Sequence, residues 1–267
     1  PSTQYHVYAR TNCGAGDYSD WTMQPLCSFL TQFYYGCSYE FGFEKTDAYV
    51  PHPKSTSELY YIHPALQIDV LTDSKPSSYS YYPYCRVNTT SYAYSLDGDG
   101  ALLLPSTTSK YQPYVVLPVT DCNTRRSLQM DVRAGYENIY STYSKTTSCP
   151  SNPSFLLGTI DKNAGIETLE ILGRVPLVFH PTSDTIKVEN NKLYEHFIFD
   201  LDAQIVQNKQ IVIINDLDVT GTLTVDNIKM GESLGYGYVF IDSCIVEENN
   251  VSLYWKNMGG PWNIYAI

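Results

Sequence analysis

Residues 127–133 read Ser-Leu-Gln-Met-Asp-Val-Arg, which is typical of a β-strand, and they stand in a long series of similar segments. The segments are rich in β-branched or aromatic residues, and turns rich in Gly, Pro, Asn and Asp separate them. We expect strands at 65–71, 92–95, 101–104, 114–117, 127–133, 155–160, 167–178, 194–201, 210–215 and 238–247. Residues 165–172 fit neither a helical nor a strand period cleanly, and we assign them to strand or turn. So many strands without a clear helix predict an all-β protein, with the two-sheet jelly-roll β-sandwich as its natural closure.

The composition supports this fold class and excludes several functions. Tyrosine is unusually frequent, with 25 residues among 267, whereas charged residues make up only 17%. A formal net charge of -11 offers a nucleic-acid backbone no cluster of cations to bind. The sequence has no run of about 18 apolar residues, so we expect no membrane-spanning segment. It also lacks a signal-peptide pattern at its N-terminus, and any export signal is expected outside this sequence.

Both ends of the chain are interpreted as parts of separate β-domains. Residues 5–10 alternate as a strand does, a turn-rich loop follows at 12–17, and a second extended segment ends at 28–31, which together predict a hairpin. At the other end, 251–255 and 262–267 read as two strands around a turn. Two strands cannot bury a core alone, so each end is expected to belong to a domain cut by the limits of the sequence. The expected organisation is a hairpin fragment at 1–31, a sandwich at 32–248 that opens with 39–44, and the start of another domain at 249–267.

The terminal segments carry a family resemblance. The first hairpin contains Tyr5-His6-Val7-Tyr8-Ala9-Arg10, Cys13-Gly14, Asp17-Tyr18-Ser19-Asp20-Trp21 and Ser28-Phe29-Leu30-Thr31. This series resembles the last hairpin of fibronectin type III domains in Bacteroidetes surface proteins. Residues 251–255 followed by 262–267 look like the second and third strands of another such domain.

The central region carries a second resemblance. It contains, in order, Phe43-Glu44, Tyr94-Ser95, Asp97-Gly98-Asp99-Gly100-Ala101-Leu102, Tyr114-Val115-Val116-Leu117-Pro118, Leu128-Gln129-Met130-Asp131-Val132-Arg133, Leu156-Leu157-Gly158-Thr159-Ile160-Asp161 and Tyr238-Val239-Phe240-Ile241-Asp242-Ser243-Cys244-Ile245-Val246. This order resembles the MAM-like jelly-roll modules of the same bacteria, including cleaved-adhesin domains. One departure is that the Tyr-rich stretch 45–90 lacks the Gly-Trp usually found soon after the Phe-Glu. The resemblance implies a binding module in an extracellular, multidomain surface protein.

The resemblance also implies a structural Ca²⁺ ion. In related jelly rolls a carboxylate after the first strand and one on the last strand share the ion, and Glu44 and Asp242 occupy the matching positions. Asp97 and Asp99 lie in a Gly-flanked loop that could add oxygens to the shell of about six to eight that Ca²⁺ requires. The alternative is that Asp97 and Asp99 simply form turns and that Asp242 caps a strand end.

Tyrosine clusters are the candidate ligand contacts. They are Tyr81, Tyr82 and Tyr84 in one Pro- and Ser-rich segment and Tyr136, Tyr140 and Tyr143 in another. Sugar rings stack on flat side chains, and tyrosine also offers protein partners a large contact area at low entropic cost. The alternative is that tyrosine is a common strand residue and has no ligand role here.

No motif in the sequence marks a catalytic centre. The five histidines stand in ordinary contexts, and there is no Gly-x-Ser-x-Gly nucleophile elbow. Carboxylate pairs suited to glycoside cleavage could be drawn from any chain with 28 acidic residues, so their presence indicates nothing. We therefore expect a protein that is not an enzyme.

The seven cysteines favour an oxidising compartment. They have no metal-ligand spacing, so disulfides are a better interpretation than zinc. Two of Cys13, Cys27 and Cys37 could pair, and Cys122 and Cys149 could join the ends of the excursion between them. The alternative is buried, reduced thiols that act as small apolar side chains.

Three functions remain open at this point. The first is a non-catalytic, extracellular adhesin-type module that binds a glycan or a host or surface protein within a tandem-domain protein. The second is a structural repeat of a filament or stalk, in which incomplete terminal domains associate with copies of the same chain. The third is an accessory domain of a secreted hydrolase.

Overall fold

The computed structural model describes residues 4–14, 17–23, 27–30, 36–44, 47, 49–51, 61–71, 86–88, 96, 100–106, 112–120, 122–135, 150–180, 193–217, 221–247 and 250–255. The chain divides into two compact units, Pro1–Tyr34 and Tyr35–Ile267. The expected strands at 92–95 and 262–267 lie outside the described residues.

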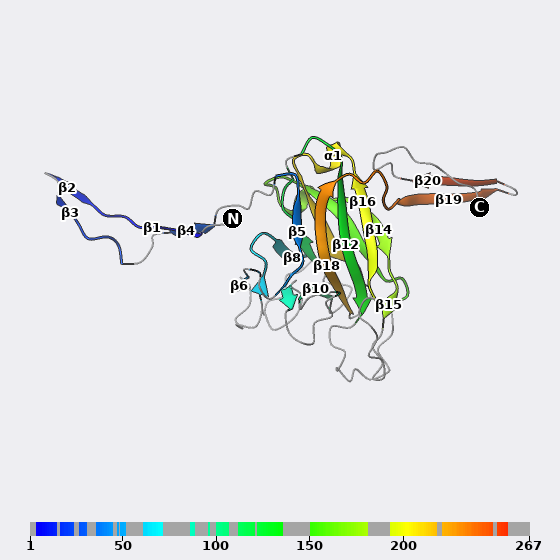
Figure 1. Cartoon of the computed structure of the whole chain (residues 1–267), viewed down its shortest axis with the longest axis horizontal. Helices are drawn as coiled ribbons and strands as arrows, with labels where there is room; N and C mark the ends of the chain where they lie inside the picture. Colours follow the sequence, from blue (N-terminus) through cyan, green and yellow to red (C-terminus); the bar gives the residue numbers. More distant parts are fainter. Residues whose placement is uncertain are drawn as a thin grey trace, which may run out of the picture. The chain divides into compact units, whose positions relative to one another are not determined.

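The first unit is an antiparallel ribbon (Figure 1). β1 (Gln4–Val7) pairs with β4 (Cys27–Leu30), and β2 (Asn12–Gly14) pairs with β3 (Asp17–Tyr18). The predicted hairpin is therefore confirmed. The guanidinium of Arg10 lies 4.0 Å from the ring centre of Tyr18 and 4.9 Å from that of Trp21, and these cation–π contacts order the exposed side chains of the ribbon.

The second unit contains two packed sheets, which confirms the all-β, two-sheet sandwich (Figure 1). Among the described residues, the larger sheet has nine strands. Its order is β15 (Phe179–His180), β12 (Arg126–Gly135), β18 (Gly221–Glu232), β10 (Ala101–Ser106), β9 (Arg86–Asn88), β7 (Tyr61–Ile62) and β6 (Val50–Pro51), with β16 (Glu195–Leu201) also paired to β12 and β5 (Tyr39–Phe41) also paired to β18.

The smaller sheet has five strands in the described part of the chain. Their order is β14 (Glu170–Pro176), β13 (Ser154–Asp161), β17 (Lys209–Asn215), β11 (Gln112–Val116) and β8 (Gln67–Leu71). The main core lies between the two sheets, where alternate residues of β12 such as Leu128, Met130 and Val132 are fully buried. Two short helical turns, η1 (Ile166–Thr168) and α1 (Ala203–Val206), complete the described elements of the sandwich.

The longest described strand, β18, was not among the expected strands. Leu223 and Val225 face the core in its first half, but Ile228 and Met230 face the core in its second half, so the alternation slips by one residue. The slip falls at Asn227, whose φ of 49° places it in the left-handed region, and the pairing with β12 shifts register there. A Gly-, Asp- and Asn-containing segment with a broken alternation looks like a turn in sequence, yet it forms a bulged strand.

Two other expectations are corrected. The first part of the strand expected at 167–178 is a 3₁₀ turn, η1, because the loop folds back before β14 begins at Glu170. Only the second part of the strand expected at 238–247 is a strand, because residues 238–240 belong to none. Phe240 packs in the core at 4% exposure, whereas Ile241 is 62% exposed and begins β19 (Ile241–Glu247), which pairs with β20 (Asn250–Trp255) in a separate two-stranded sheet.

The segment between β18 and β19 is tied to the sandwich by Asp200, a buried carboxylate on β16. Asp200 accepts hydrogen bonds from the Arg125 guanidinium at 2.5 Å, from Ser127 at 3.2 Å and from Ser233 at 2.5 Å. One buried carboxylate thereby joins β12, β16 and the chain that follows β18. We expect its loss to loosen all three, because a buried donor left unpaired is costly.

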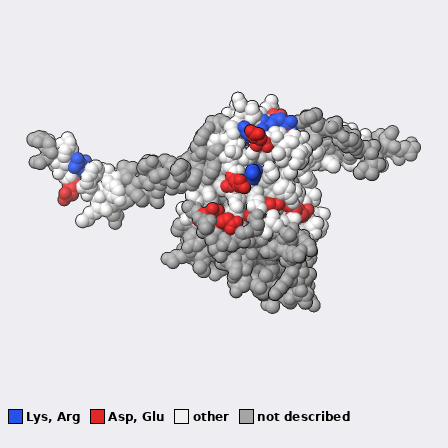
Figure 2. Space-filling view, viewed as in Figure 1, with Lys and Arg blue, Asp and Glu red and all other residues white. Residues whose placement is uncertain are grey.

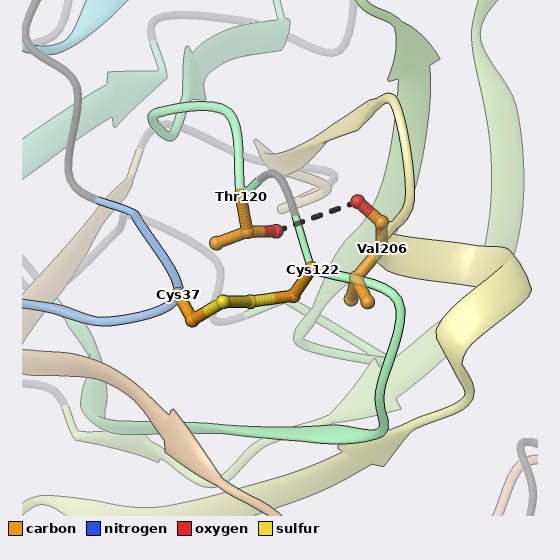
Figure 3. The surroundings of a disulfide bond; sticks show 4 residues. All are labelled: Cys37, Thr120, Cys122 and Val206. Carbon is orange, nitrogen blue, oxygen red and sulfur yellow. Dashed lines mark hydrogen bonds between the residues drawn. A yellow bond between two sulfur atoms is a disulfide. The ribbon is translucent and has the colours of Figure 1, made fainter.

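A disulfide joins Cys37, just before β5, to Cys122, in the loop between β11 and β12 (Figure 3). Their Cα atoms are 5.4 Å apart, within the usual range for a disulfide. The loop is further held by Thr120, whose hydroxyl donates to the Val206 carbonyl at 3.4 Å. The alternative pairing of Cys122 with Cys149, and that of Cys37 with a cysteine of the first hairpin, are therefore wrong.

Candidate ligand-binding site

The predicted calcium residues are only partly covered by the structure. Glu44 follows β5 directly after Phe43, a buried residue with a φ of 58°; the Glu44 amide donates to Asp47 at 3.0 Å. β5 pairs with β18, whereas Asp242 belongs to β19, which pairs with β20.

The other two predicted calcium ligands, Asp97 and Asp99, and the side chain of Asp242 lie outside the described residues. Within the described ranges, no three Asp, Glu, His or Cys side chains gather as a metal site requires. The calcium site therefore stays a prediction. Both tyrosine clusters, Tyr81, Tyr82 and Tyr84 and Tyr136, Tyr140 and Tyr143, also lie outside the described residues, and their ligand role stays a prediction too.

Carboxylates gather in a band across the described face of the nine-stranded sheet (Figure 2). Asp131 and Asp226 stand opposite each other in the β12–β18 register. Asp131 accepts from Asn227 at 3.1 Å and contacts the His196 ring nitrogen Nδ1 at 2.8 Å. The two oxygens of Asp226 accept from the Leu96 and Asn227 amides, each at 2.9 Å. All four oxygens therefore already bind protein groups, and the pair holds the bulge of β18 in place.

Arg133 lies on the same outward face and is fully buried. A Cβ added to Gly135 would stand 2.6 Å from the Arg133 guanidinium, so glycine leaves the space that this side chain occupies. Burial lowers the pKa of His180, and the positive charge of Arg133 lowers it further. This part of the sheet is a packed polar layer rather than an open surface.

The outward face of the five-stranded sheet is unusual because it is apolar. The outer face of an antiparallel sandwich is normally polar, so that apolar and polar residues alternate along each strand. Here the outward residues of β11, β13 and β17 form a second apolar cluster of their own. Its buried members are Tyr114, Val116, Ile160, Val212 and Ile214. This sheet therefore has a buried apolar layer on both of its faces.

The loop between β13 and β14 covers one end of this second cluster, with Ile166 and Leu169 packed against it. The close approach depends on Gly158 at a bulge of β13, because a Cβ there would stand 2.9 Å from both the Leu169 side chain and the Glu170 carbonyl. A larger residue would push the loop away from the sheet.

A cleft of about 140 Å³ opens between this loop and the edge strand β8. It is lined by Gln67, Ile68, Asp69, Tyr114, Val116, Ile160, Ala164, Gly165 and Ile166. Tyr114 is only 8% exposed and contributes part of the wall, while Gln67 and Asp69 place an amide and a carboxylate at the rim beside it. The exposed surface of the cleft is mainly polar, because Val116 and Ile160 beneath it are each only 2% exposed.

The sequence contains one signal for this site, which lies in β17. β8 and β11 are both among the expected strands, but the cleft depends on which side chains face outward. β17 contains a continuous apolar run, made of Ile211, Val212, Ile213 and Ile214. Such a run indicates a strand buried on both faces, and would have pointed to an apolar layer outside the sandwich.

Comparison with known proteins gives a weak likeness of fold. No protein-family model matches the chain, and no curated protein does. The K1 cleaved adhesin domain of Lys-gingipain from Porphyromonas gingivalis W83 is similar with a TM-score of 0.46 and 8% identity, over 74% of this chain and 99% of that domain. The CBM22-1 xylan-binding domain of Xyn10C from Paenibacillus barcinonensis is similar with a TM-score of 0.35 and 9% identity, over 72% of this chain and 92% of that domain. Likenesses at this level carry no argument about function.

Within the part of the chain that the structure describes, no helix has the length and apolar character needed to cross a membrane.

Proposed function

We propose that this chain is a non-catalytic, extracellular binding module that takes a glycan in the cleft between β8 and the β13–β14 loop. The observation that carries the proposal is the cleft itself, in which Tyr114 and Ile166 present a small apolar surface beside the polar groups of Gln67 and Asp69. The disulfide between β5 and the β11–β12 loop supports the extracellular assignment, because such bonds persist in oxidising surroundings.

A sugar matches these groups chemically. One face of a sugar ring presents C–H groups that pack on a small apolar surface, and the ring edge presents hydroxyls that need hydrogen-bond partners. The Asp69 carboxylate accepts hydrogen bonds from hydroxyls, and the Gln67 amide both donates and accepts. The same set of groups has no nucleophile–base pair, so the site is suited to binding rather than to cleavage.

The test is a glycan array probed with the full chain and with two variants. Ala164→Gln places a longer side chain in the cleft, and Ala203→Gln makes the same change on α1, away from it. Binding that persists in Ala203→Gln and is lost in Ala164→Gln supports the proposal. An array on which the unaltered chain binds no glycan, or binds one equally well with Ala164→Gln, removes it.

A second candidate is a structural repeat that associates with copies of itself. It is supported by the β19–β20 ribbon, where Val246 is 68% exposed and Tyr254 is 52% exposed on a sheet of only two strands. Exposed apolar side chains on a small sheet gain free energy when another surface covers them. Light scattering over a range of concentrations tests it: association that Val246→Glu abolishes supports this candidate, and a monomer at every concentration removes it.

A structural calcium ion with Glu44, Asp97, Asp99 and Asp242 among its ligands is kept as a separate proposal, with chelation as its test.

A further inference from the structure

We infer that the cleft takes one uncharged sugar unit at the end of a glycan, rather than an internal stretch of a polysaccharide or an acidic sugar. This inference rests on the proposed function and adds the ligand class to it. Three features of the cleft carry it, namely its size, the rigidity of its rim and its charge.

The size of the cleft limits the ligand to about one ring. Its volume of about 140 Å³ lies well below the roughly 300–1,000 Å³ of sites that enclose ligands of several rings. A chain of linked rings would have to continue over the β13–β14 loop or beyond β8.

The rim formed by the β13–β14 loop is fixed before a ligand arrives. The Thr168 hydroxyl bridges the loop, accepting from the Asp161 amide at 3.1 Å and donating to the Gly165 carbonyl at 3.0 Å. The Gly165 amide donates to Glu167 at 2.9 Å, and such backbone hydrogen bonds lower the pKa of this exposed carboxyl. The Lys162 amide donates to the Asn208 carbonyl at 2.7 Å. A rim held this way closes that end of the cleft and does not open to let a chain pass through.

The charge of the cleft is negative. Asp69 is the only side chain charged at neutral pH among the described residues that line it, and its Oδ1 accepts from the Val70 amide at 2.9 Å. A carboxylate or sulfate on a sugar would stand beside this anion on a chain of net charge -11. Uncharged sugars avoid this repulsion and offer hydroxyls that a carboxylate binds strongly.

The test uses the full chain and a defined sugar panel, with binding followed by saturation-transfer NMR and calorimetry. The panel contains glucose, galactose, mannose, N-acetylglucosamine and N-acetylgalactosamine, the uronic acids of the first two, and linked oligomers of each neutral sugar up to the hexamer. We expect a neutral monosaccharide to bind within about threefold of its oligomers, and its uronic acid to bind at least about tenfold more weakly.

The Asp69→Asn variant removes the negative charge of the cleft while keeping the size of the side chain, so it tests the effect of charge alone. Losing a hydrogen bond to a charged acceptor weakens binding of the neutral sugar by about tenfold or more, and the discrimination against its uronic acid should shrink at the same time. Glu40→Gln makes the matched change on the other sheet, where Glu40 lies 3.7 Å from Lys229, and should change neither value.

The outcomes distinguish the inference from the proposed function. Affinity that rises with each added sugar unit, or uronic acids that bind as tightly as neutral sugars, overturns the inference, while binding sensitive to Ala164→Gln keeps the proposed function. If the chain binds no glycan on the array and no sugar in the panel, the inference and the proposed function are both overturned.

Discussion

Removing the Cys37–Cys122 disulfide should cost this protein a large share of its stability. The bond joins residues 85 apart in sequence. In the chain-entropy treatment, closing a loop of that length lowers the entropy of the unfolded chain enough to stabilise the folded state by about 4.6 kcal/mol at 25 °C. Measured losses on removing native disulfides run from about 2 to 5 kcal/mol, and small domains have only about 5–15 kcal/mol in total.

The change is best made by substitution, because a reductant would also reach the other cysteines. The double variant Cys37→Ser/Cys122→Ser removes only this bond, and Cys244→Ser, an exposed free thiol on β19, is its control. Urea unfolding at matched concentrations should place the free energy of unfolding of the double variant about 2–5 kcal/mol below that of the unaltered chain. For a domain of this size, a loss of 4.6 kcal/mol lowers the Tm by about 9–18 °C. Cys244→Ser should leave both quantities unchanged.

Two results would refute this reasoning. A loss below about 1 kcal/mol in the double variant would mean that the loop is already confined in the unfolded state or that the bond does not form. Mass spectrometry of the unaltered chain after alkylation without reductant must also find Cys37 and Cys122 protected, and alkylation of either would contradict the assigned pair.

Four further predictions concern other parts of the molecule. Gly158→Ala should lower the free energy of unfolding by about 1–3 kcal/mol in urea titrations and weaken glycan binding, because its Cβ meets the β13–β14 loop at 2.9 Å, whereas Gly231→Ala, with no atom within 4 Å, should do neither. Asp200→Asn should cost about 1–3 kcal/mol in the same assay, since it weakens three hydrogen bonds to a buried carboxylate, and an unchanged midpoint would contradict the anchoring role. Burial holds the pKa of His63 below its usual 6.5, so the unfolded chain binds the proton more readily; stability should be full above pH 6.5 and fall as the pH drops toward the folded pKa, and His63→Gln should flatten that fall. A chelator should lower the Tm if Ca²⁺ binds near Glu44 as proposed, by an amount equivalent to about 2.7 kcal/mol when free Ca²⁺ was one hundred times its Kd, and an identical melting curve removes the site.

The sequence predicts well those strands whose alternation is complete. β12 has four core residues at every second position, and its predicted range of 127–133 lies within the observed strand. β18 was not expected, because the bulge at Asn227 reverses which residues face inward halfway along. A pattern with period two cannot reveal a strand whose phase changes, unless the Asp-Asn pair is interpreted as a bulge rather than a turn.

The candidate site was harder to predict than the fold. Its lining comes from β8, β11, β13 and a loop, and these become neighbours only when the five-stranded sheet forms. Nothing local to Asp69 or Ala164 distinguishes them from other surface residues. The Cys37–Cys122 pairing was out of reach for the same reason, because it depends on which loops the sandwich brings to one end. The frequency of tyrosine, by contrast, predicts ligand contacts at two clusters that lie outside the described residues.

The covalent link between Cys37 and Cys122 also determines how the molecule responds to a pulling force. Tension applied to the chain on either side of the sandwich passes directly from one sulfur to the other, so the residues between them carry no load. At about 3.3–3.6 Å per residue, the 85-residue separation would otherwise release roughly 300 Å of extended chain on unravelling. The segment from β5 to β11 would therefore stay closed by the disulfide even after the rest of the sandwich had unfolded. Unfolding under force would then lengthen the molecule by less than it would without the bond.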